Sequence, residues 1–245
     1  MVSVFQIPIN TISSEIESLE IDRIEQYNKF KEKGYDYIPI FRNNRFVGVL
    51  DTNSIEIDKL ENQIKHDPET IINSNTSIDE ALEILVQKKY LILINEHFQY
   101  TIITEADLLK SPFRLFLFEK INEFEEVITK IIKNYFENDF NIIEKKKLLS
   151  DKKLSDVYKR YNEQKKKNIY IDHFQCLDLI HKKDIIKKSE LYKKMNIKIT
   201  KKEFERDFNQ INILRNDVVH NKDYIINRTP EKIISILKAI KEITT

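Results

Sequence analysis

One strand-and-helix pattern occurs twice in the first half of the chain, and this repeat limits the possible folds most strongly. In the first copy, the sequence pattern predicts two short strands, 37–41 and 45–50, which an Arg-Asn-Asn turn separates. A gapless shift of 53 residues places Tyr37 on Tyr90 and brings similar apolar runs together. Each copy follows a helix-like segment, at residues 20–33 and 77–89. The sequence therefore predicts a tandem α/β repeat.

Glycine and proline are rare in the 245-residue chain, which holds two and five of them respectively. Their scarcity argues against a loop-rich all-β fold and favours long helices. The chain has no leader-like apolar segment, no run approaching about 20 apolar residues, and one cysteine, Cys176. These features predict an α+β, cytoplasmic protein without disulfides and without a membrane partner.

The net charge of +1 hides a division between the two halves. Residues 1–112 carry 11 Lys or Arg against 19 Asp or Glu, a net of −8, whereas residues 113–245 carry 30 against 21, a net of +9. A basic half can attract a polyanion through phosphate contacts, although lysine runs are also common on solvated helix faces. RNA is thus a candidate partner of the second half.

The run from Thr101 to Asp107 resembles the Gly-hydrophobic-hydrophobic-Thr-x-x-Asp pattern of cystathionine-β-synthase-type (CBS) domains. This resemblance implies that residues 1–110 form a tandem CBS pair that binds an adenine nucleotide as a regulatory ligand. Asp107 would hold the ribose hydroxyls, and Thr104 would contact ribose or phosphate.

Two departures from the CBS pattern limit this expectation. Thr101 replaces the glycine, and the first copy has Asp51 and Ser54 where threonine and aspartate belong, so we expect at most one nucleotide site. Thr104 and Asp107 also fit a capping box for the helix that begins there, which is the alternative interpretation.

The sequence of the second half predicts an all-α bundle over residues 111–245. A Ser-Pro pair marks the start of its first helix. Apolar positions recur at helical spacing from Phe113 to Tyr135, including Ile131, and predict a long helix ending near Asn138. A short helix is expected near 154–161. Further helices are expected at 173–188, 189–195, 200–219 and 229–243.

An arginine interrupts the apolar face of the helix expected at 200–219. At about 100° per residue, Arg215 falls among the apolar positions, a placement that is costly unless the cation meets an anion, a partner surface or water. The angle is counted around the helix axis from Phe204. The other apolar positions within about 60° of it are Phe208, Ile211, Val218 and Val219.

His220 follows Arg215 by five residues, a turn of about 140° on a regular helix. Both side chains can therefore face one pocket only if the helix ends near Val219 or if two chains share the site. Asn221 is a suitable C-terminal cap, and a twofold dimer would place two such motifs opposite each other.

The stretch from Leu214 to Asn221 resembles the Arg-polar-x-x-x-His motif of the HEPN superfamily, many of whose members are metal-independent endoribonucleases that act as dimers. The resemblance implies that Arg215 and His220 are the catalytic pair and that Asn216 is the adjoining polar residue. The family often adds an acidic or polar residue from another helix. The candidates are Glu119, Glu123, Glu125 and Glu126.

These residue types suit RNA cleavage through the 2′-hydroxyl. Histidine is the residue type that exchanges protons most readily near neutral pH, so His220 could be the proton acceptor or donor. Arg215 could stabilise a charged transition state, and Asn216 could position the phosphate or the histidine. No metal site is indicated, because the histidines are scattered. Alternatively, Arg215 reaches past apolar neighbours to a surface carboxylate and His220 simply ends the helix. The other histidines, expected at the surface or at caps, are His66, His97, His173 and His181.

Together these patterns predict a nucleotide sensor joined to an endoribonuclease that needs no cofactor for catalysis. By analogy it would act as an antiviral-defence or toxin effector. Two alternatives remain open. One is a non-catalytic nucleotide-sensing protein that dimerises or binds a partner, and the other is a HEPN toxin neutralised by a separate antitoxin.

Overall fold

The computed structural model describes residues 8–15, 17–55, 57–95, 99–195, 200–220 and 229–244. The chain divides into two units, Met1–Phe113 and Arg114–Thr245. None of the described helices combines the length and the apolar character needed to cross a membrane.

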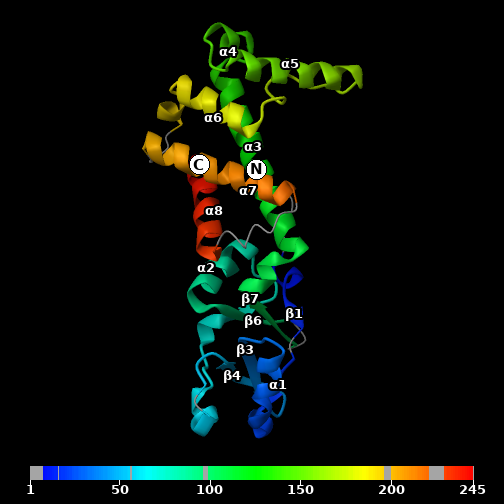
Figure 1. Ribbon diagram of the computed structural model, residues 1–245, viewed down its shortest axis with the longest axis vertical. Helices are drawn as coiled ribbons and strands as arrows, with labels where there is room; N and C mark the ends of the chain where they lie inside the picture. Colours follow the sequence, from blue (N-terminus) through cyan, green and yellow to red (C-terminus); the bar gives the residue numbers. More distant parts are fainter. Residues whose placement is uncertain are drawn as a thin grey trace. The chain divides into compact units, whose positions relative to one another are not determined.

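The first unit contains two sheets of the same design (Figure 1). In each, a hairpin pairs antiparallel and a short strand runs parallel to its first member. This is the topology expected of the sequence repeat. One sheet has the order β2 (Leu19–Glu20), β3 (Tyr37–Arg42), β4 (Arg45–Asp51), and the other β1 (Ser14–Glu15), β7 (Tyr100–Thr104), β6 (Tyr90–Ile94), β5 (Ile71–Asn73).

Short local signals fix the ends of these elements. Asn43 and Asn44 have φ of 51° and 62°, the left-handed pair that a tight hairpin between β3 and β4 requires. Ser77 accepts a hydrogen bond from the backbone N–H of Glu80, 3.3 Å away, and so caps α2 (Ile78–Lys88). The other helical elements of this unit are η1 (Ile9–Thr11), η2 (Ile21–Gln26), α1 (Tyr27–Glu32), η3 (Ile57–Gln63), η4 (Pro68–Thr70) and η5 (Glu105–Leu109).

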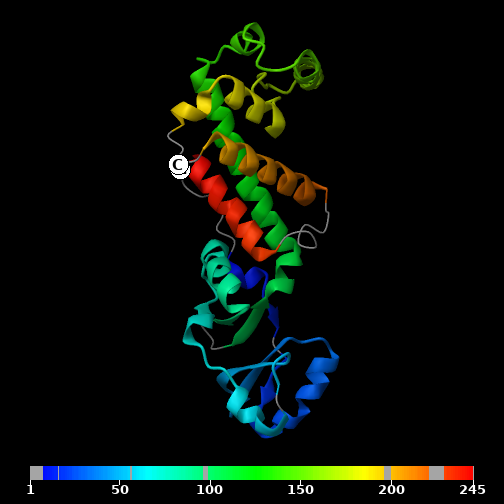
Figure 2. The same ribbon diagram turned by 60° about the vertical axis from the view of Figure 1, so that its left-hand side comes forward.

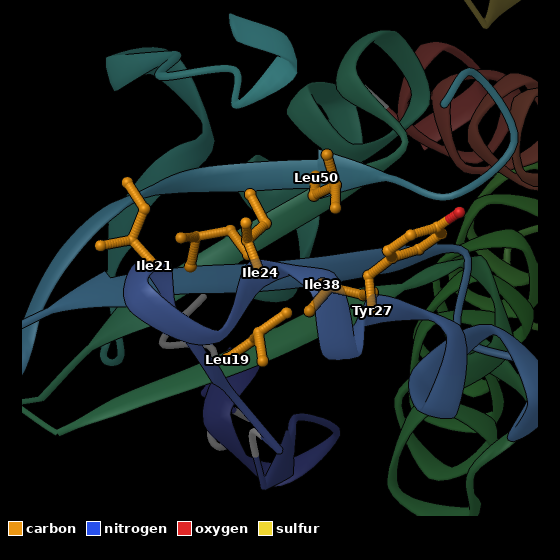
Figure 3. Packing of buried hydrophobic residues seen from close by; sticks show 7 residues of the cluster. Leu19, Ile21, Ile24, Tyr27, Ile38 and Leu50 are labelled. Atoms are coloured by element: carbon orange, nitrogen blue, oxygen red, sulfur yellow. The ribbon is translucent and has the colours of Figure 1, made fainter. Parts of the chain in front are cut away.

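Two apolar clusters among the described residues contribute to the core of the first unit. One lies between the β2-β3-β4 sheet and its helices, where the side chains of the labelled residues converge (Figure 3). The other joins the two sheets, because Val49 packs with Ile92 and Ile102, and the rings of Tyr37 and Tyr90 lie 4.9 Å apart. The two repeats therefore pack face to face.

The second unit is helical, and its described residues, 114–195, 200–220 and 229–244, include no strand. Within it α7 lies against α6 and α8 (Figures 1 and 2). The ring of Phe124 on α3 lies 5.3 Å from that of Phe208 on α7. The helices are α3 (Ser111–Tyr135), α4 (Asn141–Lys145), α5 (Asp151–Lys166), α6 (Leu179–Lys188), η6 (Leu191–Lys194), α7 (Lys201–Val219) and α8 (Pro230–Thr244).

Some expected boundaries were wrong. The first long helix stops at Tyr135 because Glu137 and Asn138 adopt left-handed φ of 51° and 63°. Its buried stripe also drifts, so that Ile132 is buried in place of Ile131.

Three further helices differ from expectation. The helix α5 has 16 residues, since lysines extend a helix well beyond the apolar centre at 154–161. The helix α6 begins at Leu179 and not at 173, because Asp178 is its N-cap. The helix expected at 189–195 is the short 3-10 turn η6.

Candidate functional site

The helix α7 carries the Arg215 motif, and a capping box fixes its start. Thr200 accepts from the N–H of Glu203 at 3.3 Å, and the Glu203 carboxylate accepts from the N–H of Thr200 at 2.8 Å. Val219, expected on the apolar stripe, is instead 43% exposed, since it lies at the edge of that stripe in the last turn. The residues that α7 buries are Phe204, Phe208, Ile211, Leu214 and Val218.

Arg215 is half-buried on this stripe and meets an anion from another helix. Its Nε lies 3.4 Å from Oε1 of Glu125 on α3, and its Nη1 donates to Oδ1 of Asn216 at 3.3 Å. Glu125 is therefore the one of the four candidate glutamates that reaches Arg215 in the described part of the chain. Of the others, Glu123 pairs with Lys120 at 3.8 Å.

A second cation, which the sequence analysis missed, holds the other oxygen of Glu125. Nζ of Lys182 on α6 lies 3.2 Å from Oε2 of Glu125 and 3.4 Å from its backbone oxygen. The Lys182 side chain is only 5% exposed, and burial lowers its pKa although Glu125 opposes the shift. Lys182 lies on a helical stripe with Leu179 and Ile185. The signal that revealed Arg215, a cation among apolar positions, was therefore present here too.

His220 lies just past the end of α7. It has φ of −90° and ψ of 13°, and its backbone N–H donates to the carbonyl of Asn216 at 3.0 Å. The helix therefore ends at Val219, as one of the two expectations required. The imidazole is nevertheless exposed, and no contact within the described chain joins it to Arg215. Asn221, the expected cap, lies outside the described residues.

A polar cavity of about 530 Å³ adjoins Glu125 within the second unit. Its wall holds three acids and three lysines, so it is neutral overall and rich in hydrogen-bonding groups. No group of three or more His, Cys, Asp or Glu in the described residues could hold a metal ion. The lining residues are Asn122, Glu125, Glu126, Thr129, Lys130, Lys133, Asp172, Gln175 and Lys182.

Thr104 and Asp107 form the capping box of η5. Oδ2 of Asp107 accepts from the N–H of Thr104 at 2.7 Å and from its hydroxyl at 3.2 Å. Oδ1 lies 2.7 Å from both the Ser14 hydroxyl and Nζ of Lys110. Both oxygens of this buried carboxylate are thus engaged within the chain.

The same two residues line a cavity of about 260 Å³ in the first unit. Four carboxylates face it, and its lining, taken from the described residues, contains no Lys or Arg. Lys33 and Lys110 pair with two of the four, Glu17 and Asp107, and the other two, Glu15 and Asp36, leave the lining acidic. The lining comprises Ser14, Glu15, Glu17, Gly34, Tyr35, Asp36, Tyr37, Pro39, Ile102, Thr104, Ala106 and Asp107.

The residues of the first copy that correspond to the Thr101–Asp107 run contribute to packing and to a turn. A Cβ on Gly48 would lie 2.6 Å from the backbone oxygen of Lys65, so this glycine permits close packing of two chain segments. Asp51 accepts from the N–H of Asn53 at 3.0 Å, and Ser54 donates to the Asp51 carbonyl at 3.4 Å. These contacts close the turn after β4.

The remaining histidines have structural environments. His66 is exposed, as expected, and His181 caps α6, where its Nδ1 accepts from the N–H of Asp178 at 3.2 Å. His173 is partly exposed, and its ring stacks on Tyr161 at 3.9 Å and on Phe140 at 5.1 Å. His97 lies outside the described residues.

Comparisons with known proteins give structural likenesses to CBS-domain proteins, each over 42% of this chain. A CBS-domain-containing protein of unknown function from Bacillus anthracis is 18% identical over 91% of its own chain, with a TM-score of 0.35. The CBS domain of a bacterial CNNM/CorC family Mg2+ transporter is 17% identical over 73%, with a TM-score of 0.34. A conserved CBS domain protein of unknown function from Thermoplasma acidophilum is 12% identical over 67%, with a TM-score of 0.36.

All three TM-scores lie below 0.5, and we draw no conclusion from these likenesses. No protein-family model matches the sequence, and no curated protein matches it significantly.

Proposed function

We propose that the second unit is a HEPN-type endoribonuclease, active as a homodimer and regulated by ligand binding to a CBS pair in the first unit. One observation supports this most. Arg215 is placed among buried residues and tied to Glu125 through Nε, so most of its donors remain available to a phosphate. A guanidinium presents five N–H groups in a fixed fork that matches phosphate oxygens.

The proposed chemistry follows from these residue types. The 2′-hydroxyl of RNA attacks the adjacent phosphorus, His220 accepts the hydroxyl proton, and the bond to the 5′-oxygen breaks as that oxygen takes up a proton. The products are a 2′,3′-cyclic phosphate and a free 5′-hydroxyl. Arg215 stabilises the charge that develops on the phosphate oxygens, and Asn216 restrains the guanidinium.

A homodimer accounts for the separation of the two residues. Within one chain, Arg215 points to α3 whereas His220 is exposed at the end of α7. A second copy can bring its own histidine to the arginine of the first, which makes a composite site.

Cleavage of labelled RNA by the full chain, with a chelator present, tests this activity. We expect Arg215→Ala and His220→Ala each to lower kcat/KM by about 100-fold or more, the usual effect of removing a charged or proton-transferring group. Arg206→Ala is the matched control, because Arg206 is exposed on the same helix and pairs with its neighbour Asp207. Cleavage that survives both site substitutions would remove these residues from the mechanism.

The ligand of the first unit is an adenine nucleoside or nucleotide bound in the cavity beside Thr104 and Asp107. The duplicated α/β repeat and the position of this cavity support the proposal. Because four carboxylates face the cavity, added phosphates should weaken binding, which gives the order adenosine, AMP, ATP.

Calorimetry with adenosine, AMP and ATP measures this order. Asp107→Asn should weaken binding, whereas Asp51→Asn, at the place in the first copy that matches Thr104, should not. Equal binding by the Asp107 variant, with its fold checked by circular dichroism, would refute the site.

A non-catalytic, ligand-sensing and partner-binding protein is the alternative. The contact of Arg215 with Glu125 favours it, since an ordinary structural ion pair has the same form. If no RNA is cut with or without a nucleotide while the protein still dimerises, this alternative replaces the ribonuclease.

A further inference from the structure

Glu125 divides its carboxylate between two cations from two different helices. Oε1 faces Nε of Arg215 on α7 at 3.4 Å, and Oε2 faces Nζ of Lys182 on α6 at 3.2 Å. Each cation therefore receives one oxygen. Lys182 also reaches the Glu125 backbone oxygen at 3.4 Å, which fixes its ammonium beside α3.

The division is unusual for an arginine and a carboxylate. Such pairs frequently form two parallel N–H···O bonds, because the guanidinium fork matches the two oxygens. Here Arg215 makes one long contact with Glu125, through Nε, and no hydrogen bond or ion pair joins its Nη2 to a described residue. The oxygen that would complete the fork is the one that Lys182 holds.

Burying the ammonium of Lys182 at its position also costs free energy. Its side chain is 5% exposed on a stripe with Leu179, Ile185 and Ile186, where an apolar residue would pack without a desolvation cost. Packing alone therefore does not explain the cation. The lowered pKa of Lys182 has the same physical origin, the burial of an ammonium.

We propose that Lys182 is a positioning residue, which holds the second oxygen of Glu125 and thereby keeps the Arg215 fork open for a phosphate. This inference rests on the proposed function, in which Arg215 contacts the scissile phosphate. Without Lys182, Glu125 would turn both oxygens to Arg215 and compete with the substrate for the same donors.

Lys182→Met in the full chain is the first test. Glu125 keeps Arg215 as its counterion in this variant, so no charge is stranded and the thermal midpoint should not fall. The expected result is a loss of about 10- to 100-fold in kcat/KM, carried mainly by a higher KM, since the phosphate must displace a bidentate carboxylate. Lys130→Met is the matched control, because Lys130 lines the same cavity, is exposed and has no partner among the described residues.

A double variant separates positioning from simple loss of a packed side chain. Glu125→Gln in the Lys182→Met background removes the charge that would clamp Arg215, and it should restore at least half of the lost activity on a logarithmic scale. A double variant as inactive as Lys182→Met, or a Lys182→Met protein as active as wild type, would overturn the proposal.

A crystal structure of Lys182→Met tests the same idea without RNA. We expect both Glu125 oxygens within hydrogen-bond distance of Arg215. An unchanged single contact would contradict the proposal even if the protein proves not to be a ribonuclease. Conversely, the wild-type protein could cut no RNA while both Glu125 oxygens contact Arg215 in Lys182→Met. That outcome would refute the proposed function and still support the role of Lys182 in positioning Glu125.

Discussion

At the scale of the residue, Glu125 links three helices of the second unit, α3, α6 and α7. It is the counterion of the buried Lys182 and also of Arg215. Removing one member of a buried pair strands the other charge, which typically costs about 3–5 kcal/mol. The two cations are unequal in this respect, since the Arg215 side chain is 38% exposed and that of Lys182 only 5%.

Glu125→Gln should therefore destabilise the protein by about 3 kcal/mol, the lower end of that range, because the amide oxygen still accepts a hydrogen bond. Urea unfolding measures the change in the free energy of unfolding. Glu126→Gln is the control, since Glu126 is the exposed neighbour and has no partner among the described residues. Equal midpoints for the two variants would show that Lys182 does not depend on Glu125.

His181 couples the stability of the second unit to pH. Its Nδ1 accepts the N–H of Asp178, and burial lowers its pKa below the ordinary value of 6.5. The folded state thus binds this proton less readily than the unfolded state. The stabilisation is complete above pH 6.5 and is lost as the pH falls below it, by at most about 1.4 kcal/mol per pH unit.

Urea unfolding at pH 7.5 and 5.5 checks this dependence. In His181→Asn the pH dependence should become shallower, with part remaining because burial also lowers the pKa of His173. An unchanged slope in the variant would assign the effect to other groups.

At the scale of the element, the sequence was most informative where several signals agreed. The helix α7 had a clear apolar period and a suitable C-terminal cap in Asn221, and its expected bounds match the structure closely. The helices α5 and α6 were misjudged, because lysine-rich ends and short capped turns carry little periodic signal.

The candidate site shows the same limit. The misplaced charge of Arg215 could be recognised from helical spacing alone, but its partner could not be chosen among four glutamates on one helix. That choice depends on how α3 crosses α7, which is a tertiary property. Lys182 was missed although the same signal was present, because four of the ten residues of α6 are lysines and the sequence does not mark which of them is buried.

At the scale of the whole molecule, an acidic unit with an acidic cavity is joined to a basic helical unit. For a ligand of the first unit to regulate the second, it must bind two arrangements of the protein with different affinities. A composite site in a dimer provides such arrangements, because its two halves can separate without unfolding either unit.

Complementation between two inactive variants tests the central claim, a ribonuclease site shared by two chains. Arg215→Ala and His220→Ala proteins, each inactive alone, are mixed in equal amounts after mild dissociation. Half of the dimers are then mixed, and each of these regains one of its two sites, so about a quarter of wild-type RNA cleavage should return. A mixture as inactive as its components, from a wild-type protein that cuts RNA, would contradict a shared site. A wild-type protein that cuts no RNA would contradict the ribonuclease itself.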